Sequence, residues 1–183
     1  MDINPTNLEG QLLLAVPTID DERFARSVIY ITEHNAQGAT GYVLNKPSAN
    51  TVLQDILVKM PQELMDTDAA QLPVFVGGPV QSEHGHILYP QESQQNLVAS
   101  TSLEILVKAI KTNQHPLPPM RLMLGCASWT SGQLEDELRE NVWLTLPFKT
   151  KDIFNIAPEQ LYDYCLASMG FNLSAISHEG GLA

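Results

Sequence analysis

The sequence predicts an α/β (α+β) fold in which a mixed β-sheet carries flanking helices. Short apolar segments rich in β-branched residues recur along the chain, and glycine, proline or asparagine interrupts them. Helical patterns occur singly among these strands, whereas a regular series of β-α-β units would place one after every strand. A chain of 183 residues with no Gly-, Ser- or Pro-rich stretch to divide it fits a single domain spanning residues 1–183.

The N-terminal part of the chain predicts three strands. They are Gly10–Val16, Ser27–Thr32 and Gly41–Asn45. The last two form a hairpin, because the loop His34–Gly38 between them offers Asn and Gly for turn positions with positive φ. Pro47 is then expected to stop the third strand.

The middle of the chain predicts one helix and three short strands. The helix is Thr51–Met60, because Thr51 is a suitable N-cap and the apolar residues after it fall on one face. The strands are Leu72–Val76, which Gly77-Gly78-Pro79 interrupts, His86–Tyr89 and Leu97–Ser100.

Three helices are predicted in the second half from signals at their ends. Two follow a Thr that has Glu or Gln three residues further on, which is the capping-box spacing, and the third follows a proline and ends at a glycine. These helices are Ser102–Lys111 after Thr101, Leu134–Glu140 after Thr130, and Glu159–Met169 between Pro158 and Gly170. Further strands are predicted at Arg121–Gly125, Val142–Leu146 and Asp152–Ile156.

The chain is strongly acidic. It has 21 Asp and Glu residues against 10 Lys and Arg residues, for a formal net charge of −11 and a pI of about 4.7. Binding to nucleic acid depends on basic side chains that neutralise phosphates, and the basic residues here occur only as scattered pairs. We therefore expect no direct binding to nucleic acid or to anionic membranes.

Cysteine usage and hydropathy indicate a cytoplasmic protein. Cys126 and Cys165 lie far apart and outside any CxxC spacing, so free thiols in a reducing compartment are expected. The N-terminus lacks the basic region of a signal peptide, and no apolar run approaches the roughly 20 residues that span a bilayer.

Gly125–Gln133 has the outline of a strand that enters a helix through small residues. This outline can hold a phosphate, but GxGxxG and GxxxxGK[ST] are both absent, and the carboxylates at 135–137 would repel an anion. Ser128 misses the GxSxG spacing of a nucleophile elbow, and the apolar neighbours of Cys126 would raise its pKa. A packed strand–helix corner is the favoured interpretation, and no catalytic residue is assigned.

Polar residues gather at two further places. Glu33-His34-Asn35 at the hairpin tip could form a general acid–base pair, or could serve the turn and face solvent. The second set could line a polar cleft or form a solvated acidic helix face, and it consists of Gln133, Glu135, Glu137 and Asn141.

His84 and His86 could point to the same side of a strand and so bind a metal ion. However, neither a cysteine nor a third histidine stands at metal-ligand spacing from them. No metal site and no cofactor is therefore predicted.

Several segments resemble the AlgH/YqgE family of small bacterial proteins, in the family's order and over nearly the whole chain. The segments are GQLLLAVPTIDDERFARSVIYITEHNAQGATGYVLNKP, VFVGGPV with HILY, LGCASWTSGQLEDELRENVWL, and MGFNLSAIS with GGLA. Three places depart from the family's pattern. Cys126 stands where an aromatic residue is usual, Tyr89 where a histidine is usual, and Tyr162 and Tyr164 in the region of a usual tryptophan.

The resemblance implies a single α/β domain with a strongly bent sheet that approaches a pseudo-barrel. It implies no activity, because the family is chiefly described as uncharacterised and its name reflects a proposed role in regulating alginate synthesis. The residues that match the family's polar and glycine motifs form the candidate ligand-binding site. They are Glu33, His34, Asn35, Asn45, Pro47, Gly77, Gly78, Pro79, Gly125, Trp129, Gln133, Glu135 and Asn141.

Three functional hypotheses follow. The first is a non-catalytic binding or regulatory protein that recognises a small molecule or a protein, because the sequence shows neither a nucleophile–base pair nor a metal-ligand set. The alternative is an enzyme of unknown class that uses Glu33 and His34 with the Gly125–Glu137 corner. The third is a transcriptional regulator that acts on DNA, which the net charge of −11 disfavours. The ligand, the pathway and the oligomeric state stay open.

Overall fold

The structure, a computed structural model, describes residues 7–56, 64, 67–91, 96–112, 117–147 and 150–170. The strands are β1 (Gln11–Ala15), β2 (Val28–Asn35), β3 (Gly38–Val43), β4 (Pro47–Val52), β5 (Pro73–Val76), β6 (Val80–Pro90), β7 (Leu97–Ser100), β8 (Arg121–Thr130) and β9 (Trp143–Pro147). The helices are α1 (Leu53–Ile56), the 3-10 helix η2 (Asp68–Gln71), α2 (Glu104–Lys111), α3 (Gln133–Arg139), α4 (Thr150–Asn155) and α5 (Pro158–Ser168). This arrangement confirms the predicted mixed α/β fold class.

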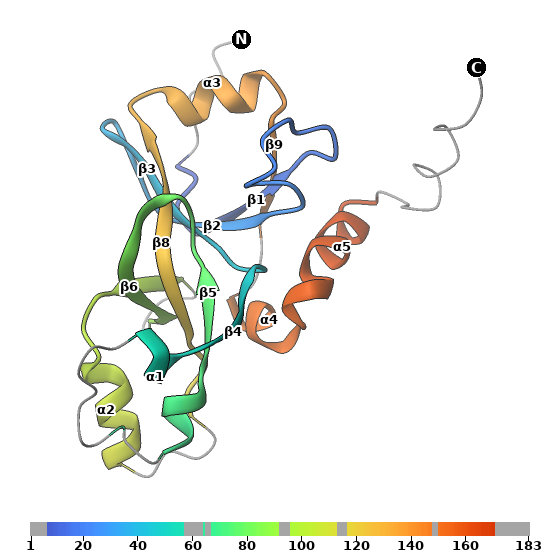
Figure 1. Cartoon of the computed structure of the whole chain (residues 1–183). Coiled ribbons are helices and arrows are strands. Elements are labelled where there is room, and N and C mark those ends of the chain that lie inside the picture. The colour runs from blue at the N-terminus through green and yellow to red at the C-terminus, as the bar shows by residue number, and fades with distance from the viewer. Residues whose placement is uncertain are drawn as a thin grey trace.

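β8 connects the two halves of the sheet, with α2 near one end and α3 near the other (Figure 1). The strand order is β4-β5-β8-β3-β2-β1-β9, and β6 pairs with both β8 and β7. The first half of β8 pairs in parallel with β5 and antiparallel with β6, whereas its second half pairs with β3. The change of partner occurs around Gly125, whose φ of +69° carries little steric cost only for glycine.

The sheet is strongly bent, as predicted, but it is not closed into a barrel. In the pairing order, β6, β8 and β3 separate β7 from β2. Nevertheless, the backbone N–H of Leu97 in β7 donates a hydrogen bond to the Tyr30 hydroxyl of β2 at 2.9 Å. β4 and β9 stand at opposite ends of the strand order and share no ladder within the described residues. The bend therefore brings β7 towards β2 without completing a cylinder.

Helices cover three parts of the sheet, each over its own apolar cluster. α5 buries Leu161 in a cluster with residues of β1 and β2, including Tyr30. α3 buries Leu134 in a cluster on the opposite face of these strands. α1 and α2 bury Leu53 and Leu106 against β5, β6 and β8. Full burial of one such side chain contributes roughly 1.5–3 kcal/mol, so each helix is fixed mainly by its apolar face.

Three glycines lie where the connection from β5 to β6 crosses β8. The N–H of Gly77 donates a hydrogen bond to the Leu124 carbonyl at 2.7 Å. A Cβ atom on Gly78 would lie 2.2 Å from the carbonyl carbon of Cys126, and one on Gly125 would lie 2.4 Å from the carbonyl oxygen of Gly78. No side chain fits at these distances, so the crossing requires glycine on both segments.

The predicted helix Thr51–Met60 is wrong at its start. Residues 51 and 52 belong to β4, and α1 covers only Leu53–Ile56; residues 57–60 lie outside the described part of the chain. Pro47 does not stop a strand but begins β4, where it pairs with Phe75. Proline is tolerated at this position because the first residue of an edge strand need not donate a ladder hydrogen bond.

The predicted strand Asp152–Ile156 is also wrong, because residues 150–155 form α4. Ile153 is fully buried, and its carbonyl accepts a hydrogen bond from Nη2 of Arg121 at 2.6 Å. A segment this short does not distinguish helix from strand by its pattern, so the tertiary contacts decide.

The predicted capping box at Thr101 does not form. α2 begins at Glu104, whose backbone N–H is accepted by the Ser102 hydroxyl at 3.1 Å. The helix itself and α5 with its leading Pro158 are confirmed. The C-terminal tail lies outside the described residues.

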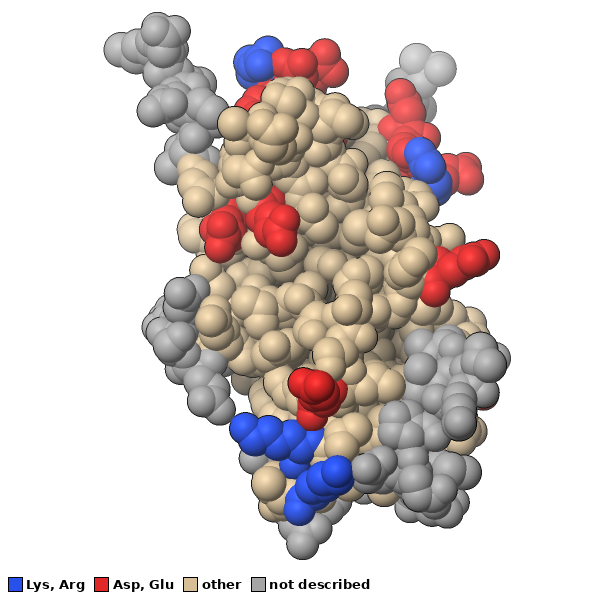
Figure 2. Space-filling view, turned by 90° about the vertical axis from the view of Figure 1, so that its left-hand side faces the viewer, with Lys and Arg blue, Asp and Glu red and all other residues tan. Residues whose placement is uncertain are grey.

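Charged groups are sparse on the side of the molecule that carries β6 and α2. Figure 2 shows this face as mostly uncharged, with Lys and Arg side chains at its lower end and further basic groups beside acidic ones at its upper edge. The last turn of α2 supplies Lys108 and Lys111. The face therefore carries no broad basic surface of the kind that binds a phosphate backbone.

Candidate functional site

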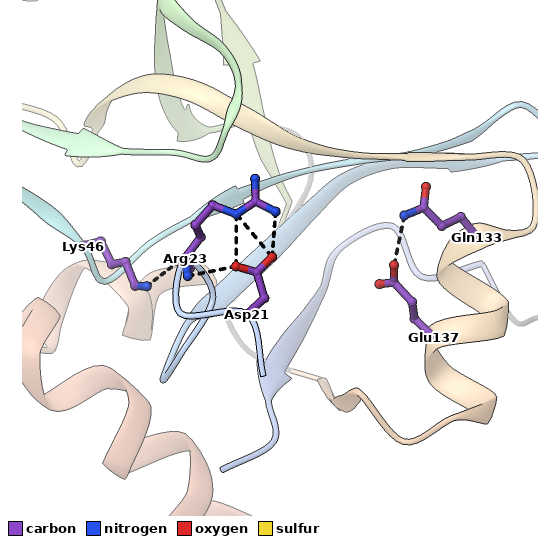
Figure 3. Close-up of polar contacts among 5 residues, drawn as sticks. All are labelled: Asp21, Arg23, Lys46, Gln133 and Glu137. Atoms are coloured by element: carbon purple, nitrogen blue, oxygen red, sulfur yellow. Dashed lines mark hydrogen bonds and ion pairs between the residues drawn. The ribbon is translucent and has the colours of Figure 1, made fainter. Parts of the chain in front are cut away.

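A hollow of about 530 Å³ opens beside α3 and faces the segment that follows β1. Its charged and amide lining consists of Asp20, Asp21, Arg23, Gln133, Glu137 and Glu140, and its aromatic lining of Phe24, Trp129 and Trp143. We call this hollow the α3 cleft. Figure 3 shows Asp21 and Arg23 on one side of it and Gln133 and Glu137 on α3 at the other.

Glu137 is the central polar residue of the α3 cleft. Its Oε2 accepts hydrogen bonds from Nε1 of Trp129 at 2.8 Å and from Nε1 of Trp143 at 2.6 Å. Its Oε1 accepts a third from Nε2 of Gln133 at 2.9 Å. All three donors are neutral, so they satisfy the oxygens of the carboxylate without cancelling its charge.

The aromatic rings of the cleft hold one another edge to face. The Trp129 and Trp143 ring centroids lie 6.1 Å apart at 82°, and Phe24 meets Trp143 at 5.6 Å and 81°. Such geometry is the favoured arrangement of aromatic pairs and adds about 0.5–1.5 kcal/mol to their burial. The cleft therefore has a stiff aromatic wall to which Glu137 is hydrogen-bonded.

Gln133 connects the start of α3 to the end of β8. Its Oε1 accepts the backbone N–H of Thr130 at 3.1 Å, while its Nε2 reaches Glu137. The hydrogen bond from Thr130 N–H to the Gln133 side chain is one of the two bonds of the predicted capping box. However, the residue at the N-cap position of α3 is Gly132, with φ of +78°. The corner predicted at Gly125–Gln133 thus turns later than expected, because β8 continues to Thr130.

The segment opposite α3 is ordered by an ion pair that the sequence interpretation missed. The Arg23 guanidinium contacts the Asp21 carboxylate at 2.7 Å and holds the pKa of that carboxyl below its usual range. Nζ of Lys46 donates to the Arg23 carbonyl at 2.5 Å, and burial lowers the pKa of this lysine. An acidic cluster followed by Arg and Phe was visible in the sequence, but nothing there placed it next to α3.

His34 and Glu135 join the β2–β3 hairpin to α3. Nε2 of His34 lies 3.0 Å from Oε1 of Glu135, and Nδ1 of His34 accepts the backbone N–H of Leu8 at 3.1 Å. Because Nδ1 accepts, the proton of the neutral ring is on Nε2 and points at the carboxylate. The His34 side chain is only 6% exposed. Both ring nitrogens are therefore engaged, Nε2 with α3 and Nδ1 with the segment that precedes β1.

Glu33 lies on the other face of the sheet from His34. In the ladder Glu33 opposes Thr40 and His34 opposes Ala39, and a bulge interrupts β2 between Ile31 and Glu33. Glu33 consequently shares a face with Thr40 and Tyr42, whereas His34 faces α3. The hairpin and the Gly125–Glu137 corner are in contact, as the enzyme hypothesis required, but Glu33 and His34 do not act on one space.

Other predicted site residues have structural roles. The Asn45 amide accepts the Val28 N–H at 2.9 Å and donates to the Arg26 carbonyl at 2.8 Å, which fixes the start of β2. Asn35 accepts the N–H of Gln37 at 2.8 Å in the hairpin turn. Gly77, Gly78 and Gly125 form the backbone crossing described above.

The structure therefore brings together only part of the predicted site. Trp129, Gln133, Asn141 and Pro79 line the α3 cleft with Glu137. Asn141 does so from the left-handed backbone conformation that ends the α3 region, at φ of +57°. Glu33 and Asn35 line other hollows, and His34 lines none of those near α3. The cleft residues from Asp20 to Phe24 were not predicted.

Within the described residues, His, Cys, Asp and Glu side chains form no group of three that could hold a metal ion. None of the helices there is long and apolar enough to cross a bilayer. Both cysteines are buried free thiols, and burial raises the pKa of Cys126 and raises that of Cys165 to about 12.

Comparison with known proteins places this fold among bacterial relatives. Residues 12–174 match the family model described as AlgH-like. A UPF0301 protein of Pseudomonas putida (strain W619) is 40% identical over 98% of this chain and 97% of its own length. A UPF0301 protein of Thioalkalivibrio sulfidiphilus is 38% identical, covering 97% and 98%. The solution structure of the AlgH protein from Pseudomonas aeruginosa superposes with a TM-score of 0.70 at 34% identity over the full length of both chains.

Proposed function

The chain belongs to the AlgH-like family, and from its own geometry we propose that it is a non-catalytic binding protein whose α3 cleft recognises the positively charged group of a small molecule. The observation that carries this proposal is the carboxylate of Glu137. It is held by two indoles and an amide, and no basic side chain among the described residues is paired with it.

The remaining charges of the cleft favour a cation in the same way. Asp20, Asp21, Glu137 and Glu140 line it against a single basic residue, Arg23, which is bound to Asp21. A cationic ligand would balance this excess of carboxylates, and the aromatic wall would add an attraction for a cation of about 0.5–2 kcal/mol. An anionic ligand would meet repulsion.

The state of the polar groups supports binding rather than catalysis. A general base needs a free acceptor within reach of a substrate, but the Glu137 oxygens already accept three hydrogen bonds and both nitrogens of His34 are engaged. Ser128, the residue that superficially suggests a nucleophile, has no histidine among the cleft residues to activate it. A stiff set of satisfied groups is suited to recognising a shape and a charge.

The proposal is tested by titrating the full chain with phenethylamine and with 2-phenylethanol, its uncharged analogue. The sequence contains two tryptophans and both line the cleft, so their fluorescence reports this site alone. We expect the amine to bind more tightly than the alcohol by at least about tenfold, which corresponds to about 1.4 kcal/mol, and to weaken as salt is added.

The double variant Asp20→Asn, Glu140→Gln removes two exposed carboxylates of the cleft and should weaken amine binding by about tenfold. Glu159→Gln removes an exposed carboxylate on α5, outside the cleft, and is the matched control. Equal binding of amine and alcohol, or no binding of either, contradicts the proposal. So does catalytic turnover in a hydrolase and transferase panel that Glu33→Gln abolishes, because that result would support the enzyme alternative.

A further inference from the structure

A second hollow of about 530 Å³ lies on the concave side of the bent sheet, away from α3. β2 and β3 supply Thr32, Glu33, Thr40 and Tyr42 to its lining, β6 supplies His86, and β7 with the residue after it supplies residues 98–101. The hydrogen bond from Leu97 N–H to the Tyr30 hydroxyl holds β7 over β2 at this place. We call this space the concave hollow.

The bulge in β2 is what gives the concave hollow its carboxylate. Without it, the alternation of a strand would put Glu33 on the same side as Ile31, towards α3. Because residues 31 and 33 instead oppose the consecutive residues Gly41 and Thr40, Glu33 is turned to the side of Tyr42. Bulges commonly re-aim a side chain in this way next to functional sites.

His86 is a half-buried residue of the hollow, and one of its ring nitrogens is buried without a hydrogen-bond partner among the described residues. Its ring meets that of Tyr42 edge to face with centroids 5.3 Å apart. Its Nδ1 is buried and has no hydrogen-bond partner within the described residues. Burial lowers the pKa of His86, whereas the nearby His84 backbone favours the protonated ring and opposes this shift. A buried nitrogen left unpaired costs about 1–3 kcal/mol, so the site gains if the ring turns and a ligand atom in the hollow reaches this nitrogen.

We propose that the concave hollow is a second binding site, for a small uncharged ligand with neighbouring hydroxyl groups, which Glu33, Tyr42 and His86 recognise together. A hydroxyl group satisfies Nδ1 of His86 in either tautomer, because it both donates and accepts. Two adjacent hydroxyls can donate to the two oxygens of one carboxylate, which is how acidic residues bind ribose in nucleotide folds.

The other lining groups argue against a charged ligand. The hydroxyls of Tyr42, Thr40 and residues 100–101 include donors that need acceptors, and an ammonium group has none to offer. Burial raises the pKa of Tyr42 to about 12, so its hydroxyl keeps its proton. An anion would be repelled by Glu33. A polyol offers donors and acceptors in the mixture that the lining requires.

The test is a titration of the isotopically labelled full chain with D-ribose and with myo-inositol, followed by NMR of the histidine ring nitrogens. We expect saturable, millimolar binding that shifts the His86 signals and leaves tryptophan fluorescence unchanged. Glu33→Ala should weaken binding by about tenfold, and so should His86→Phe, which keeps an aromatic ring against Tyr42 but removes its nitrogens.

Two controls separate this site from the α3 cleft. Glu83→Ala removes an exposed carboxylate of β6 that does not line the concave hollow and should leave polyol binding unchanged. The Asp20→Asn, Glu140→Gln variant should also bind polyols normally, even if amine binding to the cleft fails. The proposal is overturned if neither polyol binds, if Glu83→Ala weakens binding as much as Glu33→Ala, or if phenethylamine competes for the His86 signals.

Discussion

The two faces of the β2–β3 hairpin differ in how far their polar groups are already satisfied. On the face towards α3, His34 is bonded at both ring nitrogens, and Glu137 accepts three hydrogen bonds. On the concave face, Nδ1 of His86 has no partner within the described residues, and no hydrogen bond to the side chain of Glu33 is observed there. The same short hairpin thus supports one surface whose polar groups are already hydrogen-bonded and one surface whose polar groups still lack partners.

This difference teaches that polar residues adjacent in sequence need not serve one site. Glu33 and His34 are neighbours that could form a general acid–base pair on sequence grounds, yet His34 fixes α3 in the structure and Glu33 faces the other side of the sheet. A satisfied polar group is best tested through stability, and an unsatisfied one through binding. The following variants make that distinction measurable.

Gly78→Ala should have the largest effect, because it disturbs the crossing of the β5–β6 connection with β8. The new Cβ would lie 2.2 Å from the backbone of Cys126, which cannot yield as a flexible side chain could. We expect the free energy of unfolding, measured in urea, to fall by more than about 3 kcal/mol. Gly85→Ala is the control, because no atom lies within 4 Å of its new Cβ. Equal stability of the two variants would show that the crossing is not tight.

Glu137→Gln should have an intermediate effect. An amide cannot accept from both indoles and from Gln133 at once, so one donor is left without a partner and the charge assistance is lost. We expect a loss of about 2 kcal/mol in unfolding free energy together with a change in tryptophan emission. Glu140→Gln, an exposed neighbour, should change stability by less than about 0.5 kcal/mol. Similar losses in both would mean that Glu137 contributes only its charge.

Glu135→Ala and Glu33→Ala should give the smallest but most direct comparison of the two faces. Glu135→Ala removes the contact with His34 and a carboxylate that is favourable in the first turn of α3. We expect it to lower the free energy of unfolding by about 1 kcal/mol. Because Glu33 is exposed, Glu33→Ala should lower the free energy of unfolding by less than about 0.5 kcal/mol. Thermal unfolding at one pH measures both. If Glu33→Ala were the more destabilising, the concave face would be structural rather than ligand-binding.

Much of the fold could be predicted because it depends on local patterns. The β2–β3 hairpin follows from its β-branched strands and Asn–Gly loop, and α5 from its leading Pro158. β4 could not be predicted, because Thr51 and Val52 suit a helix start and only pairing with β5 makes them a strand. The same holds for α4, where burial of Ile153 decides the conformation.

The candidate site was predictable only where one segment carries it. Trp129, Gln133 and Asn141 lie in one stretch of the chain, and they do line the α3 cleft. Asp20 and Phe24 reach the same cleft from more than a hundred residues away, which no local pattern indicates. For His86, the sequence indicates only a possible metal ligand. Its association with Tyr42 depends on both strands pairing with β8.

The bulge in β2 has a consequence for how the chain can change over time. The side chains of a strand alternate between its two faces. The extra residue in β2 shifts this alternation, so odd-numbered residues point to one face before the bulge and to the other face after it. Deleting Thr32 would remove the extra residue and leave Glu33 opposite Thr40 and His34 opposite Ala39, so both side chains would keep their present directions. The hairpin can therefore lose its extra residue without exchanging its two surfaces, and substitutions can alter either surface separately.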